Sequence, residues 1–241
     1  MVVRDRVLTS HDAIPPMTII LTNDDGIDAP GLQALQDAID GKGVMFAPDR
    51  EYSGCGHQVT TQRALKLQQR GDRAFCLDGT PADCSRIALT QKYPDARWVL
   101  SGINAGGNLG IDVYMSGTVA AVREAAILGV PGIALSHWIR RPLPIDWETT
   151  ARWTRHVLDE LMGRSLPPGK FWNVNFPHLD PGSPDPELVF CTPSTQPLPV
   201  TYRVEGDRYH YTGAYPDRGR TPGTDVDVCF SGSIAIVQLS L

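Results

Sequence analysis

The stretch that decides the fold is Thr18-Ile-Ile-Leu-Thr-Asn-Asp-Asp-Gly-Ile-Asp-Ala-Pro-Gly31. Its short apolar run stops abruptly at turn-forming residues, which predicts a buried strand followed by a loop. A helical spacing of apolar residues begins at Gly31, so a strand, a loop and a helix follow one another. In open α/β sheets, ligands bind outside the carboxyl ends of the strands. The loop in that position carries two adjacent carboxylates, Asp24 and Asp25.

Neighbouring carboxylates repel each other, and each costs free energy to desolvate. A bound cation is the usual remedy, and oxygen ligands favour a hard ion such as Mg²⁺, Mn²⁺ or Ca²⁺. The alternative is a solvated turn, because Asp-Asp-Gly is ordinary turn sequence. On these residues alone the turn is the simpler interpretation, and the motifs that follow favour the cation.

The overall composition is that of an ordinary globular chain. It has 241 residues, 41% hydrophobic and 20% charged, enough for one large domain with a real core. The net charge of -5 gives no electrostatic case for binding a nucleic-acid polymer or an anionic membrane. Small phosphorylated ligands remain compatible, because they need only local positive charge.

Cysteine usage and the terminal sequence favour a cytoplasmic location. The five cysteines are odd in number and form no C-x-x-C pair, so a zinc or redox motif is disfavoured and reduced thiols are expected. No apolar run approaches the roughly 20 residues of a transmembrane helix. Residues 1–16 carry charges without the apolar region of a signal peptide, and we expect a flexible extension there.

Strand and helix patterns alternate along most of the chain, which predicts an α/β fold with a mostly parallel sheet. Strands are expected at 44–47, 98–101, 133–135 and 171–176, and a hairpin at 64–68 and 73–77. Helices are expected at 31–40, from 81 toward 91, at 119–128 and at 147–162. Thr80, Pro81 and Asp83 form a capping-box start for the second of these helices. From residue 177, Pro-rich turns alternate with short β-like runs at 188–191, 209–212 and 233–239.

Three polar loops follow three of the predicted strands. They carry Asp24 and Asp25, then Ser53, then Asn104 and Asn108. If the sheet is parallel, all three open at one edge, where their oxygens would form part of an octahedral shell completed by waters and a phosphate oxygen. Two carboxylates neutralise a divalent cation without reversing its field. Asn104 and Asn108 could equally be turn residues, and Ser53 a plain loop serine.

A second anion-binding feature begins at Ser116-Gly117-Thr118, at the start of the predicted 119–128 helix. Helix N-termini offer free N–H donors and partial positive charge to anions. Ser116 alone is better explained as an N-cap. Beside a metal loop, a phosphate site is the stronger interpretation. Asp112 is expected to be a cap or turn acid, and His57 a polar loop or packing residue.

Several rival motifs are missing from the sequence. There is no P-loop, no G-x-G-x-x-G and no G-x-S-x-G nucleophile elbow. The carboxylates are adjacent rather than spaced as D-x-D, which argues against an aspartyl-phosphate phosphatase.

Several motifs, in order along the chain, resemble the SurE (survival protein E) family of nucleotidases. The matching runs are Leu21-Thr-Asn-Asp-Asp-Gly26, Ala47-Pro-Asp-Arg50 with Ser53-Gly54, Gly79-Thr-Pro-Ala-Asp-Cys84, Ser101-Gly-Ile-Asn-Ala-Gly106 with Asn108-Leu-Gly110, Ser116-Gly-Thr-Val-Ala-Ala121, Asn173-Val-Asn175 and Gly223-Thr-Asp225. Several ordered motifs in register are far more specific than any one of them.

The resemblance implies a single Rossmann-like domain at 17–241, with a core at 17–176 and an accessory β-rich oligomerisation segment at 177–241. It implies a divalent-metal phosphatase acting on nucleoside 5′- and 3′-monophosphates, sometimes on short polyphosphate. By motif, one Mg²⁺ or Mn²⁺ per subunit would be held by Asp24, Asp25, Ser53 and Asn104. Asn108, Ser116, Gly117 and Thr118 would contact the phosphate. A homodimer or homotetramer with exchanged C-terminal segments is also implied.

The catalytic residues expected from this arrangement are Asp24 and Asp25, either of which could orient or deprotonate the attacking water. Two alternatives stay open at this point. A nucleotide-binding regulator without turnover would use the same loops. A structural Ca²⁺ site in a different hydrolase would use the same carboxylates.

Overall fold

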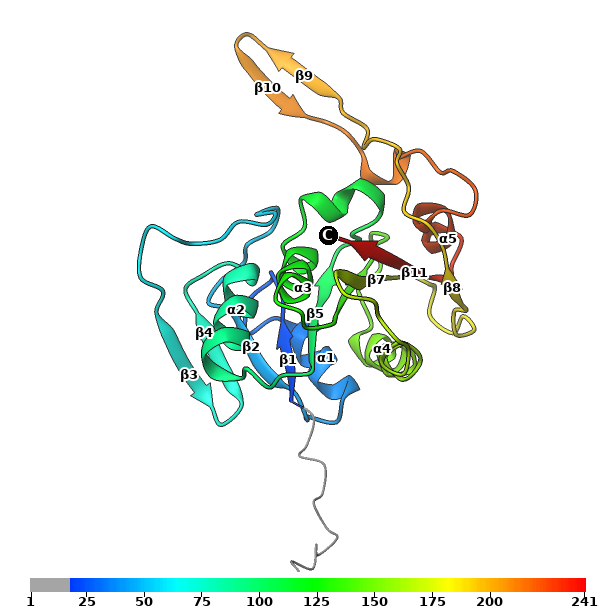
Figure 1. Cartoon of the computed structure of the whole chain (residues 1–241). Helices are drawn as coiled ribbons and strands as arrows, with labels where there is room; N and C mark the ends of the chain where they lie inside the picture. Colours follow the sequence, from blue (N-terminus) through cyan, green and yellow to red (C-terminus); the bar gives the residue numbers. More distant parts are fainter. Residues whose placement is uncertain (1–17) are drawn as a thin grey trace, which may run out of the picture.

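The computed structural model describes residues 18–241, so the extension expected at 1–16 lies outside the described residues. Its centre is a nine-stranded sheet in the order β3-β4-β2-β1-β5-β6-β7-β11-β8 (Figure 1). The strands of the first half are β1 (Ile19–Thr22), β2 (Val44–Pro48), β3 (Leu67–Gly71), β4 (Ala74–Leu77) and β5 (Trp98–Ala105). Those of the second half are β6 (Gly132–His137), β7 (Lys170–Phe176), β8 (Leu188–Phe190) and β11 (Ile234–Ser240).

Most neighbouring strands of this sheet run parallel, which confirms the predicted fold class. β1 pairs in parallel with β2 and β5, and the parallel pairing continues from β5 to β6 and from β6 to β7. The exceptions are the β3–β4 hairpin and the pairing of β11 with β7, which are antiparallel. The central strands are buried on both faces, as parallel strands covered by helices must be.

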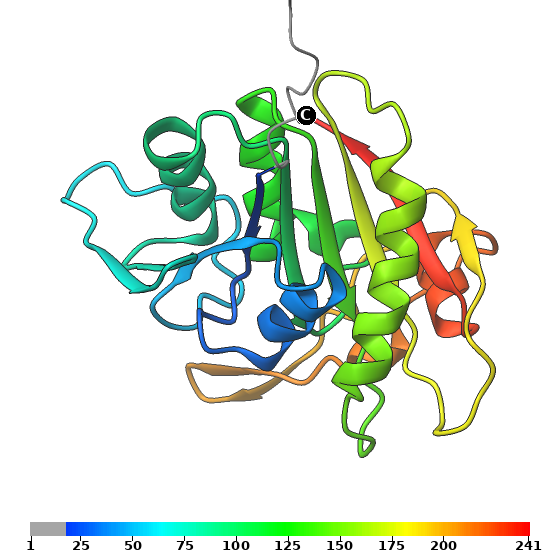
Figure 2. The same ribbon diagram turned by 90° about the horizontal axis from the view of Figure 1, so that it is seen from below.

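Helices cover both faces of the sheet (Figure 2). α1 (Pro30–Ala38) and α4 (Trp147–Met162) share one apolar core with the sheet. α2 (Pro81–Ile87), which continues into a π-helical turn at Ala88–Lys92, and α3 (Gly117–Ile127) share the core of the other face. The predicted capping box of α2 is present, with Asp83 N–H donating to the Thr80 hydroxyl and Thr80 N–H to the Asp83 carboxylate. α4 spans the predicted residues.

The chain leaves β1 and β5 in opposite directions, so their carboxyl ends form a topological switch point. From β1 it runs through α1 to β2 on one side, and from β5 through α3 to β6 on the other. The crevice between two such strands is where α/β sheets bind ligands. The loop with Asp24 and Asp25 follows β1, and Asn104 lies at the end of β5.

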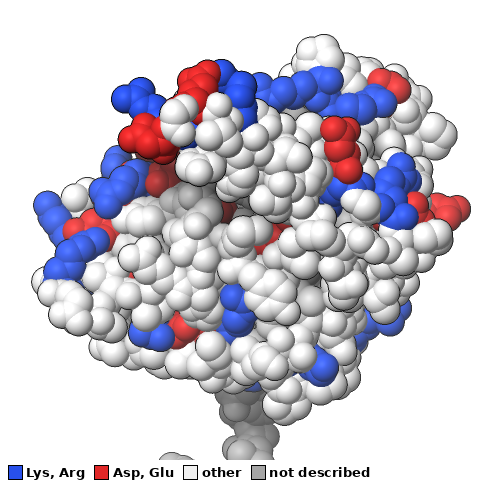
Figure 3. All heavy atoms as spheres, turned by 90° about the horizontal axis from the view of Figure 1, so that it is seen from above, with Lys and Arg blue, Asp and Glu red and all other residues white. Residues whose placement is uncertain are grey.

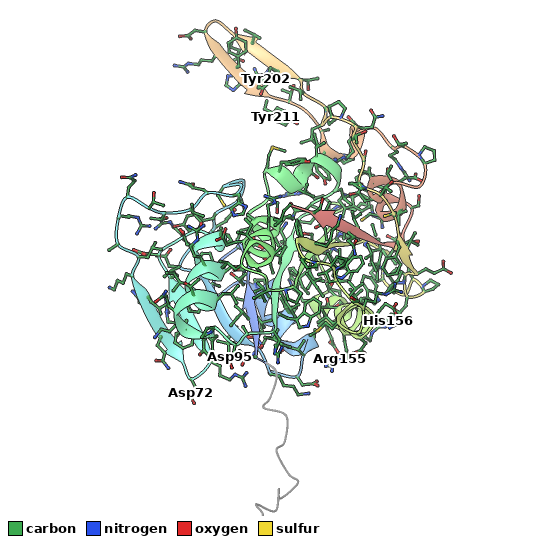
Figure 4. The ribbon with its side chains drawn as sticks, viewed as in Figure 1. Asp72, Asp95, Arg155, His156, Tyr202 and Tyr211 are labelled. Carbon is green, nitrogen blue, oxygen red and sulfur yellow. The ribbon has the colours of Figure 1, made fainter. Side chains whose placement is uncertain are left out.

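The segment after residue 177 is more varied than its sequence indicates. Strands form at the three predicted β-like runs, but β9 (Tyr202–Glu205), the short helix at Tyr215–Asp217 and α5 (Asp225–Phe230) were not predicted. β9 and β10 (Arg208–Tyr211) form an antiparallel hairpin that projects from the body of the protein. Tyr202 and Tyr211 lie on this hairpin (Figure 4). Asp95, which precedes β5, lies at the opposite end of the molecule.

Over residues 18–241, none of the helices combines the length and the apolar character needed to cross a membrane.

Candidate metal and phosphate site

A cavity of about 470 Å³ opens at the carboxyl edge of β1 and β5. Six of the residues predicted from sequence line it: Asp24, Asp25, Ser53, Asn104, Asn108 and Ser116. Glu51, Gly54, Ala105, Asp112 and Met115 complete the wall. Viewed from above, this end of the molecule has most of its Lys, Arg, Asp and Glu residues toward the rim, with small areas of Asp or Glu in the hollow between (Figure 3). The parallel sheet thus brings the three polar loops together.

Asp24 is a buried carboxylate, only 4% exposed. Its Oδ1 accepts a hydrogen bond from the Thr118 hydroxyl. Burial raises its pKa from 3.8 to about 6, with the neighbouring charge of Asp25 adding to the rise. The ionised form of this side chain is therefore costly until a cation approaches it.

Asp25 lies beside Asp24 with less burial. Its Oδ2 accepts from the backbone N–H of Ala105 at 3.3 Å, which links the loop after β1 to the end of β5. Burial raises its pKa, and the charge of Glu51 contributes to the rise. The two adjacent carboxylates thus share a site in which their negative charges are poorly compensated.

The loop with Ser53 is fastened at two points. Tyr52 N–H donates to the Asp24 carbonyl at 2.7 Å, and Gly56 N–H donates to the Met115 carbonyl at 3.0 Å. Between these points, the Ser53 hydroxyl donates to Glu51 Oε1 at 2.7 Å. The hydroxyl oxygen keeps lone pairs for a ligand.

Asn104 and Asn108 are held by different partners. The Asn104 amide donates to the Gly106 carbonyl at 2.8 Å, which directs its nitrogen away from a ligand role and leaves the side-chain oxygen available. The Asn108 amide donates to Ser136 Oγ at 2.8 Å. The Asn108 backbone bonds to β7 at both polar groups: its N–H donates to Asn175 Oδ1, and its carbonyl accepts from Asn173 and Asn175.

Ser116 is the N-cap of α3, because its hydroxyl accepts from Val119 N–H at 3.1 Å, and it also lines the cavity. Gly117 packs against Asp24, where a Cβ atom would come within 2.8 Å of the Asp24 Cβ. Thr118 lies behind Asp24, and its hydroxyl bonds to that side chain. Gly117 and Thr118 do not line the cavity, so their predicted contact with phosphate stays a prediction.

The donor set fits a hard divalent cation. Within residues 18–241, no group of three or more His, Cys, Asp or Glu side chains is arranged to hold a metal. A cation would therefore depend on the hydroxyl and amide oxygens of Ser53 and Asn104 as well as on the two carboxylates. Neutral oxygens and carboxylates suit Mg²⁺ or Mn²⁺, which usually retain several waters.

Sequence reasoning missed Glu51, and it identified only part of the role of Asp112. Glu51 stands two residues before Ser53 in the same loop, a position that could have drawn attention to it. Asp112 was expected to be a cap or turn acid, and it does accept from Leu109 N–H at 3.0 Å. It also binds Tyr215 and Arg218 of the C-terminal segment and lines the cavity. The asparagines of β7 carried a visible signal, since polar residues buried inside a strand need specific partners.

A second cavity of about 410 Å³ lies between the ends of β6 and β7 and the start of α4. His137, Trp153 and His178 line it, and it contains none of the predicted metal or phosphate residues. The chemistry proposed from sequence therefore belongs to the cavity at β1 and β5.

Comparison with known proteins agrees with this geometry. The family model described as "Survival protein SurE" matches residues 19–196. A putative 5′-nucleotidase of Nostoc is 61% identical over 224 residues, covering 92% of this chain and 99% of the relative. The "5′-nucleotidase SurE 1" of Thermus thermophilus is 37% identical, covering 93% of this chain and 92% of the relative. The crystal structure of the SurE protein from Aquifex aeolicus superposes with a TM-score of 0.81 at 31% identity, covering 92% and 93% of the two chains. The chain belongs to the SurE family.

Proposed function

We propose that this protein is a divalent-metal-dependent nucleotidase that hydrolyses nucleoside 5′-monophosphates to nucleoside and phosphate. The observation that carries the proposal is the convergence of Asp24, Asp25, Ser53, Asn104, Asn108 and Ser116 on one cavity at the sheet's switch point. Membership of the SurE family supports it, because relatives that match nearly the whole chain are named 5′-nucleotidases.

The proposed roles follow from where the side chains lie. Asp24, Asp25, Ser53 and Asn104 hold the cation, and Asn108 and the α3 N-terminus hold the phosphate. A divalent cation there supplies Lewis-acid activation of the phosphate group and of the attacking water. Asp24 or Asp25 orients that water and takes its proton. The water oxygen bonds to phosphorus, the ester P–O bond breaks, and the nucleoside oxygen leaves and is protonated.

The direct test is phosphate release from 5′-AMP with Mg²⁺, with Mn²⁺ and after chelation by EDTA. We expect release that depends on the metal and disappears with EDTA. Binding of 5′-AMP without any release would favour the non-catalytic regulator. A melting temperature raised by Ca²⁺, again without release, would favour a structural calcium site.

We extend the proposal to nucleoside 3′-monophosphates and short polyphosphate. The residues assigned to the cation and to the phosphate contact those two groups only, so the proposed contacts do not depend on which ribose hydroxyl carries the ester. A panel of 5′-AMP, 3′-AMP and tripolyphosphate, assayed with each metal, tests this breadth. Release from 5′-AMP alone would restrict the substrate to 5′-monophosphates.

We also propose a homodimer or homotetramer in which the projecting hairpin contacts a second copy. Val200, Tyr202, Val204, Tyr209 and Tyr211 are all more than half exposed on or beside β9 and β10. A two-stranded hairpin is marginal by itself, and such an apolar surface favours a partner. Light scattering of the wild type and of Tyr202→Ser/Tyr209→Ser measures the change in mass. A wild-type monomer would contradict the assembly.

The proposed location is the cytoplasm, supported by five free thiols. We expect no nucleic-acid polymer or membrane surface among the partners, in keeping with the net charge of -5. Fractionation of the native cells tests the location, and recovery with an oxidising compartment would contradict it.

A further inference from the structure

One wall of the candidate cavity is held in place by the C-terminal segment. Asp112 lines the cavity, and its Oδ2 accepts from the Tyr215 hydroxyl and from Arg218 Nη1, both at 2.6 Å. These partners lie more than 100 residues further along the chain, between the projecting hairpin and α5. The segment after residue 177 therefore supports the wall of the phosphate site through its bonds to Asp112.

Arg218 holds both the side chain and the backbone of this wall. Its Nη2 donates to the Leu109 carbonyl at 3.0 Å, while Leu109 N–H donates to Asp112 Oδ2 at 3.0 Å. The guanidinium lies over the ring of Tyr215, 4.8 Å from its centroid, and the Arg218 side chain is fully buried. The planar guanidinium group has several hydrogen-bond donors in fixed positions, so it holds its partners in one arrangement.

The same contacts lie directly before the start of α3. The Asp112 carbonyl accepts from Ser116 N–H at 3.1 Å, so Asp112 is one turn away from the predicted phosphate contact. Asn108, another predicted phosphate residue, immediately precedes Leu109. Any shift of Asp112 and Leu109 therefore moves the residues on both sides that face the phosphate.

The charge of Asp112 is the decisive feature. Its Oδ1 is buried and has no hydrogen-bond partner within residues 18–241, so the bonds on Oδ2 alone offset the negative charge of Asp112 beside the anion site. A carboxylate there repels an incoming phosphate unless a cation offsets it. Arg218 is the ion-pair partner of Asp112, and it is wholly removed from solvent, where screening is weak.

We propose that Arg218 is a positioning residue for the phosphate site: it holds the Leu109–Asp112 wall in place and offsets the Asp112 charge so that an anion can bind. Tyr215 assists by donating a further hydrogen bond to the Asp112 carboxylate. The inference rests on the proposed function, because it assumes that phosphate occupies this cavity. It assigns to the C-terminal segment a part in substrate affinity that acts through Leu109 and Asp112.

The test compares Arg218→Met, Asp112→Asn and the double variant. Binding of inorganic phosphate in the presence of Mg²⁺ is measured by calorimetry, and kcat and KM are measured separately with 5′-AMP. We expect Arg218→Met to raise the phosphate Kd and KM at least tenfold while kcat changes less than threefold. Adding Asp112→Asn should recover most of that loss, because the uncompensated charge is gone. A merely structural role predicts a double variant at least as impaired as Arg218→Met.

Arg220→Met is the matched control. Arg220 lies on the same segment, but it bonds to Asp227 and Ser231 rather than to the cavity wall. We expect its phosphate Kd to stay within twofold of the wild type. Tyr215→Phe keeps the ring and removes the hydroxyl, and we expect a two- to threefold rise in Kd.

The outcomes separate the inference from the proposed function. A wild type that binds phosphate but releases none from 5′-AMP contradicts the nucleotidase and leaves the Arg218 comparison measurable by calorimetry. A wild type without phosphate binding overturns both. An unchanged Kd in Arg218→Met, or no recovery in the double variant, overturns the inference. If Arg218→Met does not fold, Arg218→Lys decides: the charge is kept, so a Kd more than tenfold higher overturns the charge argument.

Discussion

The Asp24–Asp25 pair and Asp112 face the same cavity in opposite surroundings. Asp24 receives one hydroxyl and Asp25 one backbone N–H, and neither forms a salt bridge in the part of the chain that the structure describes. One carboxylate oxygen of Asp112 accepts hydrogen bonds from a hydroxyl, a backbone N–H and a guanidinium group. The difference indicates two uses for one residue type. Carboxylates without a protein cation suit a metal, whereas the compensated carboxylate fixes the wall.

The largest effect is expected when the uncompensated pair is broken. Asp24→Asn and Asp25→Asn should each lower kcat/KM for 5′-AMP at least ~100-fold, because the cation loses an anionic ligand. Steady-state kinetics with saturating Mn²⁺ measures this loss. Asp28→Asn, on an exposed acid of the same loop, is the control and should retain wild-type activity. Full activity in both site variants would remove the basis of the proposed enzyme.

A second prediction concerns stability without metal. The folded pKa of Asp24, about 6, lies above its ordinary value of 3.8, because burial disfavours the charge. Its stabilising contribution is therefore complete below about pH 4 and is lost as the pH rises through 6. Two pKa units amount to ~3 kcal/mol, or roughly 6–12 °C in Tm for a chain of this size.

The measurement is a series of thermal melts in EDTA from pH 4 to 7.5. The wild type should lose stability relative to Asp24→Asn across that range. Saturating Mn²⁺ should raise the wild-type Tm more at pH 7 than at pH 5, since protons compete with the cation for the carboxylate. A difference between the two proteins that does not vary with pH would show that Asp24 is not held in this uncompensated state.

The contrast between these carboxylates also shows what the sequence could predict. The capping box at Thr80 and Asp83 was readable because its partners stand three residues apart. The convergence of Asp24 and Asn104 followed from a general property of parallel strands, whose carboxyl ends share an edge. Each of these predictions needed only local spacing or strand direction.

The compensated side of the cavity could not be predicted in this way. Arg218 reaches Asp112 across 106 residues, and no spacing rule links the two positions. β11 pairs with β7 inside the main sheet through contacts that are also distant in the sequence. Local sequence patterns predicted only that Asp112 is a capping or turn residue. Its other partners depend on how the C-terminal segment packs. The helix α5 was missed for a related reason: with six residues, it is too short to show a helical period.

A third prediction concerns Asn108, which lies between the two kinds of carboxylate. Asn175 bonds to both the N–H and the carbonyl of Asn108, whereas Asn173 bonds only to the carbonyl. Asn175→Ala should cost ~2–3 kcal/mol of unfolding free energy and raise KM, because it leaves a buried N–H without an acceptor. Asn173→Ala should cost less, since Asn175 still serves the carbonyl. Urea denaturation and kinetics of both variants measure the order, and the reverse order would contradict the assignment.

The smallest effect is expected at Glu124, a second compensated carboxylate, which fastens the loop that carries Ser53. It is 1% exposed and accepts from His57 Nε2 and Arg86 Nε, each at 2.8 Å. Burial alone would raise its pKa, but these two bonds outweigh burial and hold the pKa below its ordinary value of 4.5. Its stabilisation is thus present above pH 4.5 and lost as the pH falls below that value.

Glu124→Gln should therefore cost ~1–2 kcal/mol at pH 7. The difference from the wild type should shrink at pH 4, below the ordinary pKa of 4.5, because the glutamate of the unfolded chain then takes up a proton more readily than the folded one. Urea denaturation at the two pH values measures it. The control is Glu160→Gln: Glu160 pairs with Arg164 on the surface, with 41% of its side chain exposed, so the change should stay within ~0.5 kcal/mol. A loss at Glu124 that is equally large at pH 4 would mean that shape, rather than charge, holds this loop. The distinction between compensated and uncompensated carboxylates would then apply to the cavity alone.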